Sequence, residues 1–114
     1  MSYPPSRRRH PRSLCSELVQ VSFRDQRGRR IQETGVLEDL GRGGARLSLS
    51  LPLPVGGQVN LRTTGFSVNA GVRYCELADA GYAVGLEFSA GTTWDERSWS
   101  PEHLLRIPSR EHPE

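Results

Sequence analysis

The chain has 114 residues, of which 35% are hydrophobic and 25% charged, so it is long enough for one domain with a modest core. No apolar run approaches the roughly 20 residues of a membrane-spanning helix, and none follows the basic N-terminus as in a secretory signal. We therefore expect a cytoplasmic protein that does not insert into a membrane. The formal net charge is +2, and all 15 basic residues are arginine, whose planar fork of donors suits phosphate and the guanine edge.

The N-terminal residues 1–13 are rich in proline and arginine and hold nothing that can form a core. We expect them to be a flexible basic arm. Alternating apolar residues begin at Leu18, and the barrel that they predict is assigned to residues 14–92. Residues 93–114 are expected to form a separate C-terminal segment.

Six runs of alternating apolar residues predict six strands. The second predicted strand has Gly35 within it, where an interruption is left open. Turn signals rich in glycine, proline or aspartate separate the runs. Short strands at this spacing predict an all-β fold, a six-stranded antiparallel β-barrel. The runs lie at 18–23, 31–40, 45–49, 59–61, 66–74 and 82–88.

The C-terminal segment carries a helix signal. Ser100 suits an N-cap, Pro101 the first helical position and Glu102 the first turn. Apolar residues follow at 104, 105 and 107, and Pro108 ends the pattern. We expect one short helix covering an end of the barrel.

Catalytic chemistry is not evident, and we expect neither an enzyme nor a bound cofactor or metal. The three histidines have no partner at metal-ligand spacing, and no P-loop or nucleophile elbow is present. Glu38 and Asp39 are neighbours on a predicted strand, so we expect them to point to opposite faces. Cys15 and Cys75 are expected to be reduced thiols in or near the core, with a disulfide left open.

Two short segments stand out together. The first is Arg8-x-x-x-Arg12, and the second is Asp39-Leu40-Gly41-Arg42-Gly43-Gly44. A β-rich stretch follows and ends in Gly81-Tyr82-Ala83-Val84-Gly85-Leu86-Glu87-Phe88. This order resembles the PilZ family over residues 7–88, with an RxxxR motif before the first strand and a [DN]xSxxG motif at a strand end.

The resemblance implies a barrel that binds cyclic di-GMP through its arginines. Arginine can donate two hydrogen bonds to a phosphate or to guanine O6 and N7, and a carboxylate can accept from the guanine N–H groups. One position departs from the motif, because Gly41 stands where the family has serine. By resemblance the binding roles fall to Arg8, Arg12, Asp39 and Gly44, with Arg7, Arg9, Gly41, Gly43 and Arg46 as supporting candidates.

The expected function is a bacterial second-messenger receptor or adaptor. Cyclic di-GMP would order the arm on the barrel, and the ordered arm would signal to a partner protein in trans. One alternative is a degenerate PilZ-like adaptor that binds protein and no nucleotide, which Gly41 favours. A second alternative is a small barrel that binds RNA or DNA through its arm, which is disfavoured because such binders usually show a broader basic face.

Overall fold

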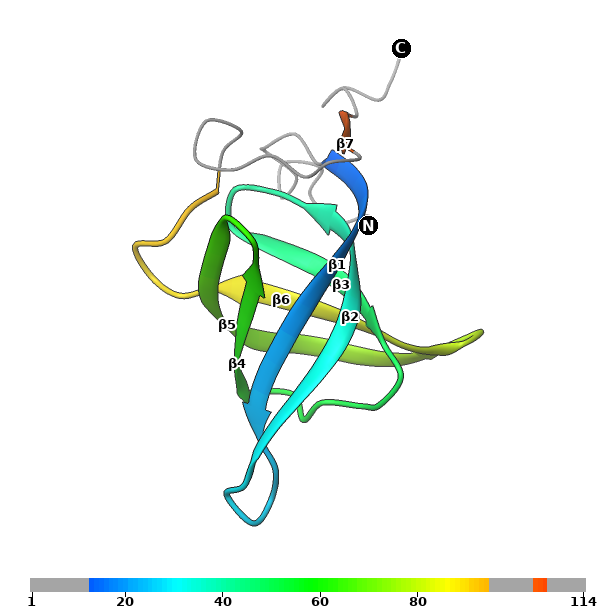
Figure 1. The fold of residues 1–114 in the computed structure, drawn as a ribbon, viewed down its shortest axis with the longest axis vertical. Helices are drawn as coiled ribbons and strands as arrows, with labels where there is room; N and C mark the ends of the chain where they lie inside the picture. The colour runs from blue at the N-terminus through cyan, green and yellow to red at the C-terminus, as the bar shows by residue number, and fades with distance from the viewer. Residues whose placement is uncertain (1–12, 95–103, 107–114) are drawn as a thin grey trace, which may run out of the picture.

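The computed structural model describes residues 13–94 and 104–106, with Ser13 and residues 104–106 described by their backbone alone. The chain forms strands joined by turns, and the part described contains no helix long and apolar enough to cross a membrane. The strands, labelled in Figure 1, are β1 (Ser13–Arg24), β2 (Arg30–Leu40), β3 (Gly44–Leu49), β4 (Gln58–Thr63), β5 (Phe66–Ala78), β6 (Gly81–Phe88) and β7 (Leu104–Arg106).

Six of these strands close into a barrel. The sheet order is β2-β3-β6-β5-β4-β1-β7, every pairing is antiparallel, and β1 also pairs with β2. That additional pairing joins the two ends of the sheet, so β1 to β6 have no open edge along their paired lengths. The prediction of a six-stranded antiparallel barrel is confirmed, and β2 runs through Gly35 without a break.

The core follows from the alternation along each strand. In β3, for example, Ala45, Leu47 and Leu49 are buried and alternate with more exposed residues. The rings of Phe66 and Phe88 meet edge to face with their centroids 6.4 Å apart, a favoured aromatic geometry. Trp94 is only 4% exposed and completes this core after β6 has ended. The largest fully buried side chains are Leu37, Leu40, Leu47, Leu61, Val21 and Val84.

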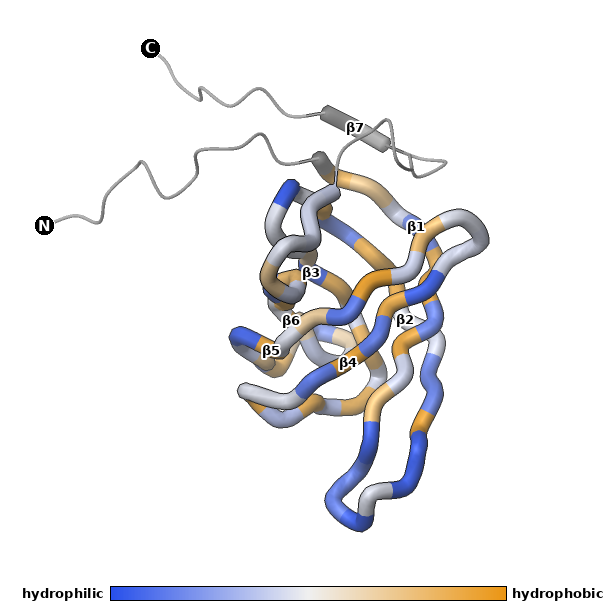
Figure 2. The backbone as a smooth tube through the Cα atoms, turned by 90° about the vertical axis from the view of Figure 1, so that its left-hand side faces the viewer, coloured by the Kyte–Doolittle hydropathy of each residue, from blue (hydrophilic) through white to orange (hydrophobic). Residues whose placement is uncertain are grey.

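The hairpin of β1 and β2 extends well beyond the barrel (Figure 1), and Figure 2 shows that its end is strongly hydrophilic. Gly28 takes the positive φ of 81° that its turn requires. Asp25 holds the turn by accepting hydrogen bonds of 2.9 Å from the backbone N–H groups of Arg27 and Arg29. The bond from Arg29 is the main reason that the pKa of Asp25 lies below its ordinary value.

The expected C-terminal helix is wrong for the three of its residues that the structure describes. Leu104–Arg106 forms strand β7, which pairs with Ser13–Cys15 at the start of β1. Strand β4 uses the same edge of β1 only at Gln20–Ser22, so the backbone groups nearer the N-terminus remain to be paired. A single helical turn between two prolines is weak by itself, and an unpaired strand edge outcompetes it. The other residues of the expected helix lie outside the described ranges.

Candidate functional site

The start of β1, which directly follows the first motif segment in the sequence, meets the second motif segment at one end of the barrel. Ser13 pairs with Leu40, and Leu14 pairs with Asp39, so the start of β1 lies beside the end of β2. Residue 12 is bonded directly to Ser13, and its Cα is therefore about 3.8 Å from that of Ser13. The arginines of the first motif, Arg7, Arg8, Arg9 and Arg12, lie outside the described residues.

The loop between β2 and β3, residues 41–43, is fixed by backbone hydrogen bonds. Gly41 N–H donates to the carbonyl of Gly44 at 2.9 Å, which closes the turn. Phe88 N–H donates to the carbonyl of Gly43 at 2.8 Å, and Trp94 N–H donates to that of Arg42 at 2.9 Å. The loop is thus anchored to the end of β6 and to buried Trp94, so it is a preformed surface.

The two candidate glycines of this loop have different reasons to be glycine. A Cβ at Gly44 would collide with the backbone carbonyl of Leu86 on β6, so close strand packing requires glycine there. A Cβ at Gly43 would meet nothing within 4 Å. Packing within the described residues therefore explains Gly44, whereas Gly43 leaves open space on the surface of the loop.

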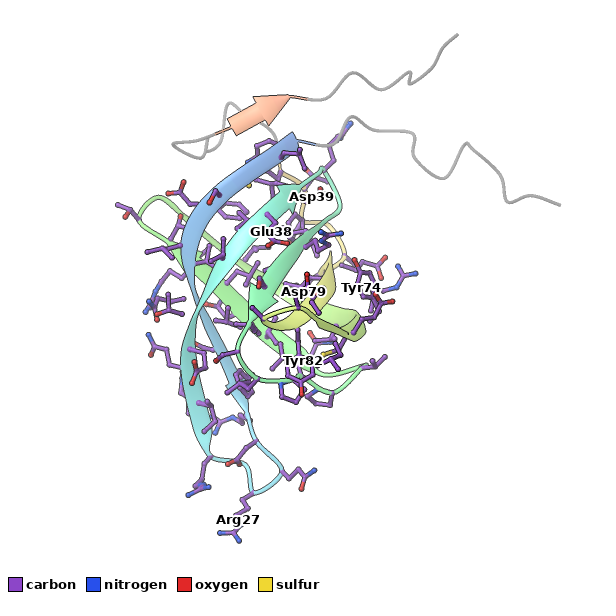
Figure 3. The ribbon with its side chains drawn as sticks, turned by 90° about the vertical axis from the view of Figure 1, so that its right-hand side faces the viewer. Arg27, Glu38, Asp39, Tyr74, Asp79 and Tyr82 are labelled. Atoms are coloured by element: carbon purple, nitrogen blue, oxygen red, sulfur yellow. The ribbon has the colours of Figure 1, made fainter. Side chains whose placement is uncertain are left out.

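Glu38 and Asp39 do not follow the simple alternation expected of them. The pairing of β2 with β3 shifts between Leu37 and Asp39, and such a bulge places two residues opposite one. Both carboxylates are half-buried, and Figure 3 shows them close together at the barrel end. The expectation that they point to opposite faces is wrong, because the bulge breaks the period of two.

Arg46 lies on β3 next to this carboxylate pair. Its register partner across the strands is Asp39, yet its Nη2 lies 3.5 Å from Oε1 of Glu38. The guanidinium is thereby held at the barrel end beside the β2–β3 loop. Asp39, Gly41, Gly43, Gly44 and Arg46, all predicted as site residues, are brought together there.

The carboxylates at this end act on Cys15 of β1. The pKa of the Cys15 thiol is raised to about 11, first by burial and then by the charges of Asp39, Glu17 and Glu38, in that order. The thiol lies 3.5 Å from the carbonyl oxygen of Leu37, to which it donates. Three carboxylates therefore lie near enough to the Cys15 thiol to affect its pKa, and they form an acidic region at the start of β1.

This charge pattern limits what the described part of the site can bind. Three carboxylates (Glu17, Glu38 and Asp39) stand against Arg42 and Arg46, so these residues alone do not attract a ligand with several phosphates. A carboxylate can accept hydrogen bonds from planar N–H groups, such as those of a base.

Two contributors were missed by the sequence reasoning. Glu38 became part of the site only through the bulge, for which the sequence carries no signal. Trp94 bonds to the loop through its backbone N–H, and it lies after the last predicted strand, where the alternation of apolar residues has ended. Both follow from the three-dimensional arrangement and not from a motif.

These features define a small closed antiparallel barrel with an anchored glycine-rich loop beside the start of its first strand. A profile of the PilZ domain matches residues 6–98, and the chain belongs to the PilZ family. The resemblance noted in the motifs is therefore confirmed. No curated protein and no solved structure compared with the chain matches it.

Proposed function

We propose that this chain is a cyclic di-GMP receptor module whose site joins the arginine arm to the Asp39–Gly44 segment. The PilZ family is associated with cyclic di-GMP as a ligand. The observation that carries the proposal is the register of β1 and β2, in which Leu14 faces Asp39. Arg12 and Arg8 precede Leu14 by two and six residues, so both are within reach of the segment that carries Asp39.

The ligand has two phosphates and two guanines, and the site offers both kinds of partner. Arg8 and Arg12 supply bidentate donors to phosphate or to guanine O6 and N7, with Arg7 and Arg9 adding charge. Asp39 accepts from the guanine N–H groups. Arg46, held near Asp39 through Glu38, can stack on a base or donate to a phosphate.

The proposed output is a change in the arm. Ligand binding orders residues 7–12 against the barrel end, and the ordered arm presents or covers a surface for a partner protein in trans. Glu17, Glu38 and Asp39 make this end of the barrel acidic and would repel an anion. In the proposed mechanism the arginines of the arm offset these negative charges, so that the anionic ligand can bind. In this proposal the module acts by binding in the cytoplasm and catalyses nothing.

A second candidate is a PilZ-type adaptor that binds protein without nucleotide. Gly41 stands at the position of the family's serine, so one hydroxyl is missing. The backbone N–H of Gly41 does not replace this donor, because it already bonds to the carbonyl of Gly44. Loss of one hydrogen bond to a charged partner weakens binding by about 10- to 100-fold.

Calorimetric titration with cyclic di-GMP at physiological salt separates the two candidates. The receptor proposal expects micromolar or tighter binding that Arg12→Ala and Asp39→Ala each abolish, with no heat from GTP or from a short single-stranded RNA. A chain that binds no cyclic di-GMP at high concentration contradicts it and favours the adaptor. Binding of the RNA that survives Asp39→Ala instead supports nucleic-acid binding through the arm, which is strongly salt-dependent.

A further inference from the structure

The end of the β1–β2 hairpin carries positive charge that its own structure does not neutralise. Residues 24–30 hold four arginines against one aspartate. That aspartate, Asp25, is engaged by Arg29, whose Nε lies 3.1 Å from Oδ2. Arg24 and Arg30 pair directly across the strands, and like charges in this position repel.

Neither member of this arginine pair has a carboxylate partner in the part of the chain that the structure describes. Arg24 donates from Nη1 to the carbonyl of Gly28 at 2.8 Å, and Arg30 makes no ion pair there. An anion bound between the two guanidinium groups would remove the repulsion. The two arginines therefore form a positively charged pair that an anionic ligand would neutralise.

A pocket of about 550 Å³ opens beside this pair, a size typical of small-molecule sites. Arg24 and Arg30 line it together with Phe23 and a row of polar residues. The row crosses three neighbouring strands, because Ser22 pairs with Asn60 and Asn60 pairs with Asn69. Among the described residues no carboxylate lines the pocket, so its chemistry favours a negatively charged ligand.

The two asparagines give the pocket a specific hydrogen-bonding character. Nδ2 of Asn60 donates to Oδ1 of Asn69 at 3.0 Å, which fixes the two amides against each other. Oδ1 of Asn60 and Nδ2 of Asn69 have no hydrogen-bond partner within the described ranges. The pair thus offers one free acceptor and one free donor on neighbouring strands, which are the two kinds of partner for the N6 donor and the N7 acceptor of an adenine edge.

We propose that this pocket binds a nucleotide unit, with phosphate at Arg24 and Arg30 and an adenine-like base edge at Asn60 and Asn69. It shares no residue with the candidate site at the other end of the barrel. Figure 3 shows Arg27 of the hairpin turn and Asp39 at opposite ends of the molecule. The proposal is therefore independent of cyclic di-GMP binding.

The test titrates ¹⁵N-labelled protein with AMP and, in a second arm, with a short oligoadenylate, followed by amide chemical shifts. We expect shifts at Ser22, Asn60 and Asn69, including the asparagine side-chain amides, while those of the Asp39–Gly44 segment stay in place. Stronger binding of the oligoadenylate would identify the source as RNA, and equal binding would identify a free nucleotide. Asp39→Ala should leave both titrations unchanged.

The variants separate a built site from general attraction to the basic hairpin. Arg30→Gln should weaken binding about tenfold, because it removes a charge-assisted contact to phosphate. Arg27→Gln removes the same charge from the same hairpin but does not line the pocket, so it should change binding less than about twofold. Equal loss in both variants, equal binding of a polyglutamate peptide, or no shifts at millimolar AMP would each overturn the proposal.

Discussion

Arg46 pairs with Asp39 in the strand register, but its guanidinium lies 3.5 Å from Glu38, the residue before it. The bulge in β2 creates this offset, because it turns both carboxylates to the same face of the strand. The 3.5 Å contact of Arg46 is therefore made with Glu38 and not with Asp39. The arginine and the aspartate are thus placed side by side at the candidate site.

The first prediction concerns Arg46→Gln. The ion pair with Glu38 is exposed, at 48% and 39% of the side chains, so its loss should change the unfolding free energy by at most about 1 kcal/mol. Affinity for cyclic di-GMP should fall about tenfold, since a charge-assisted contact is removed. Calorimetry and thermal unfolding measure the two effects.

Arg73→Gln is the matched control for this variant. Arg73 forms an exposed ion pair of the same kind, with Nη1 3.2 Å from Oε1 of Glu87. It lies on β5 and is no part of the candidate site, so affinity should stay at the wild-type value. Equal losses in the two variants would show that Arg46 acts only through net charge.

The second prediction separates Gly44 from Gly43. Gly44→Ala should lower the unfolding free energy by about 1–3 kcal/mol, because its Cβ collides with a backbone carbonyl that side-chain motion does not relieve. Gly43→Ala should change stability by less than about 0.5 kcal/mol, since the space there is open. Urea unfolding measures both. A Gly43→Ala variant that unfolds normally but loses the ligand would place the ligand against that open space.

The third prediction restores the family's hydroxyl. Gly41→Ser should tighten cyclic di-GMP binding about 10-fold or more if the chain is a receptor weakened by its glycine. The measurement is calorimetric titration, with thermal unfolding as the check that buried position 41 accepts the side chain. Unchanged affinity in a folded variant would show that the hydroxyl does not contact the ligand here.

The fourth prediction uses Cys15 as a sensor of the acidic region. Its pKa is raised from 9.0 to about 11, so near neutral pH its thiolate fraction should be about 100-fold lower than in the unfolded chain. In a Cys75→Ala background, alkylation by iodoacetamide should be correspondingly slow until the protein unfolds.

Asp39→Asn should speed this alkylation, because of the three charges that raise the Cys15 pKa it removes the one with the largest effect. Glu76→Gln is the matched control, since Glu76 is exposed on β5 and is not among those charges. A rate that does not respond to Asp39→Asn would mean that this carboxylate lies farther from β1 than the structure places it.

The fifth prediction follows from the hairpin turn. The folded-state pKa of Asp25 is lowered below 3.8, so its carboxylate stabilises the fold above that pH and the contribution is lost as pH falls through the folded pKa. Asp25→Asn should therefore be less stable than wild type at neutral pH, and the difference should shrink at about pH 2.

Urea unfolding at the two pH values tests this, with Asp79→Asn as the control. Asp79 lies in the turn between β5 and β6, and no hydrogen bond of its carboxylate is found in the described part of the chain. A difference between Asp25→Asn and wild type that persists at low pH would assign its effect to shape and not to charge.

The barrel was predictable because its strands are half-buried, and alternation at positions such as Leu47 and Leu49 records which face meets the core. The turn at Asp25–Gly28 was also predictable, since a carboxylate and a glycine at these positions satisfy the backbone locally. Local chemistry therefore determined six strands and their turns.

What the sequence did not predict depends on contacts between distant segments. The bulge that unites Glu38 with Asp39 arises from pairing with β3, and strand β7 forms because the edge of β1 near Cys15 is open. The pocket beside Arg24 and Arg30 forms because strand pairing places Ser22, Asn60 and Asn69 in one row, and no sequence motif predicts this row. Of the candidate site, the motif drew attention to the Asp39–Gly44 segment, and the ligand-binding roles of that segment and of Arg7–Arg12 both remain predictions.

The pairing of Ser13 with Arg106 brings the first and last described strands side by side. The two ends of the paired region therefore lie within one strand spacing, about 5 Å, of each other. We expect that a barrel with this arrangement can be inserted into a surface loop of a host protein without forcing the two ends of that loop apart. We also expect the fold to survive joining of these two ends and opening of the chain at another surface turn.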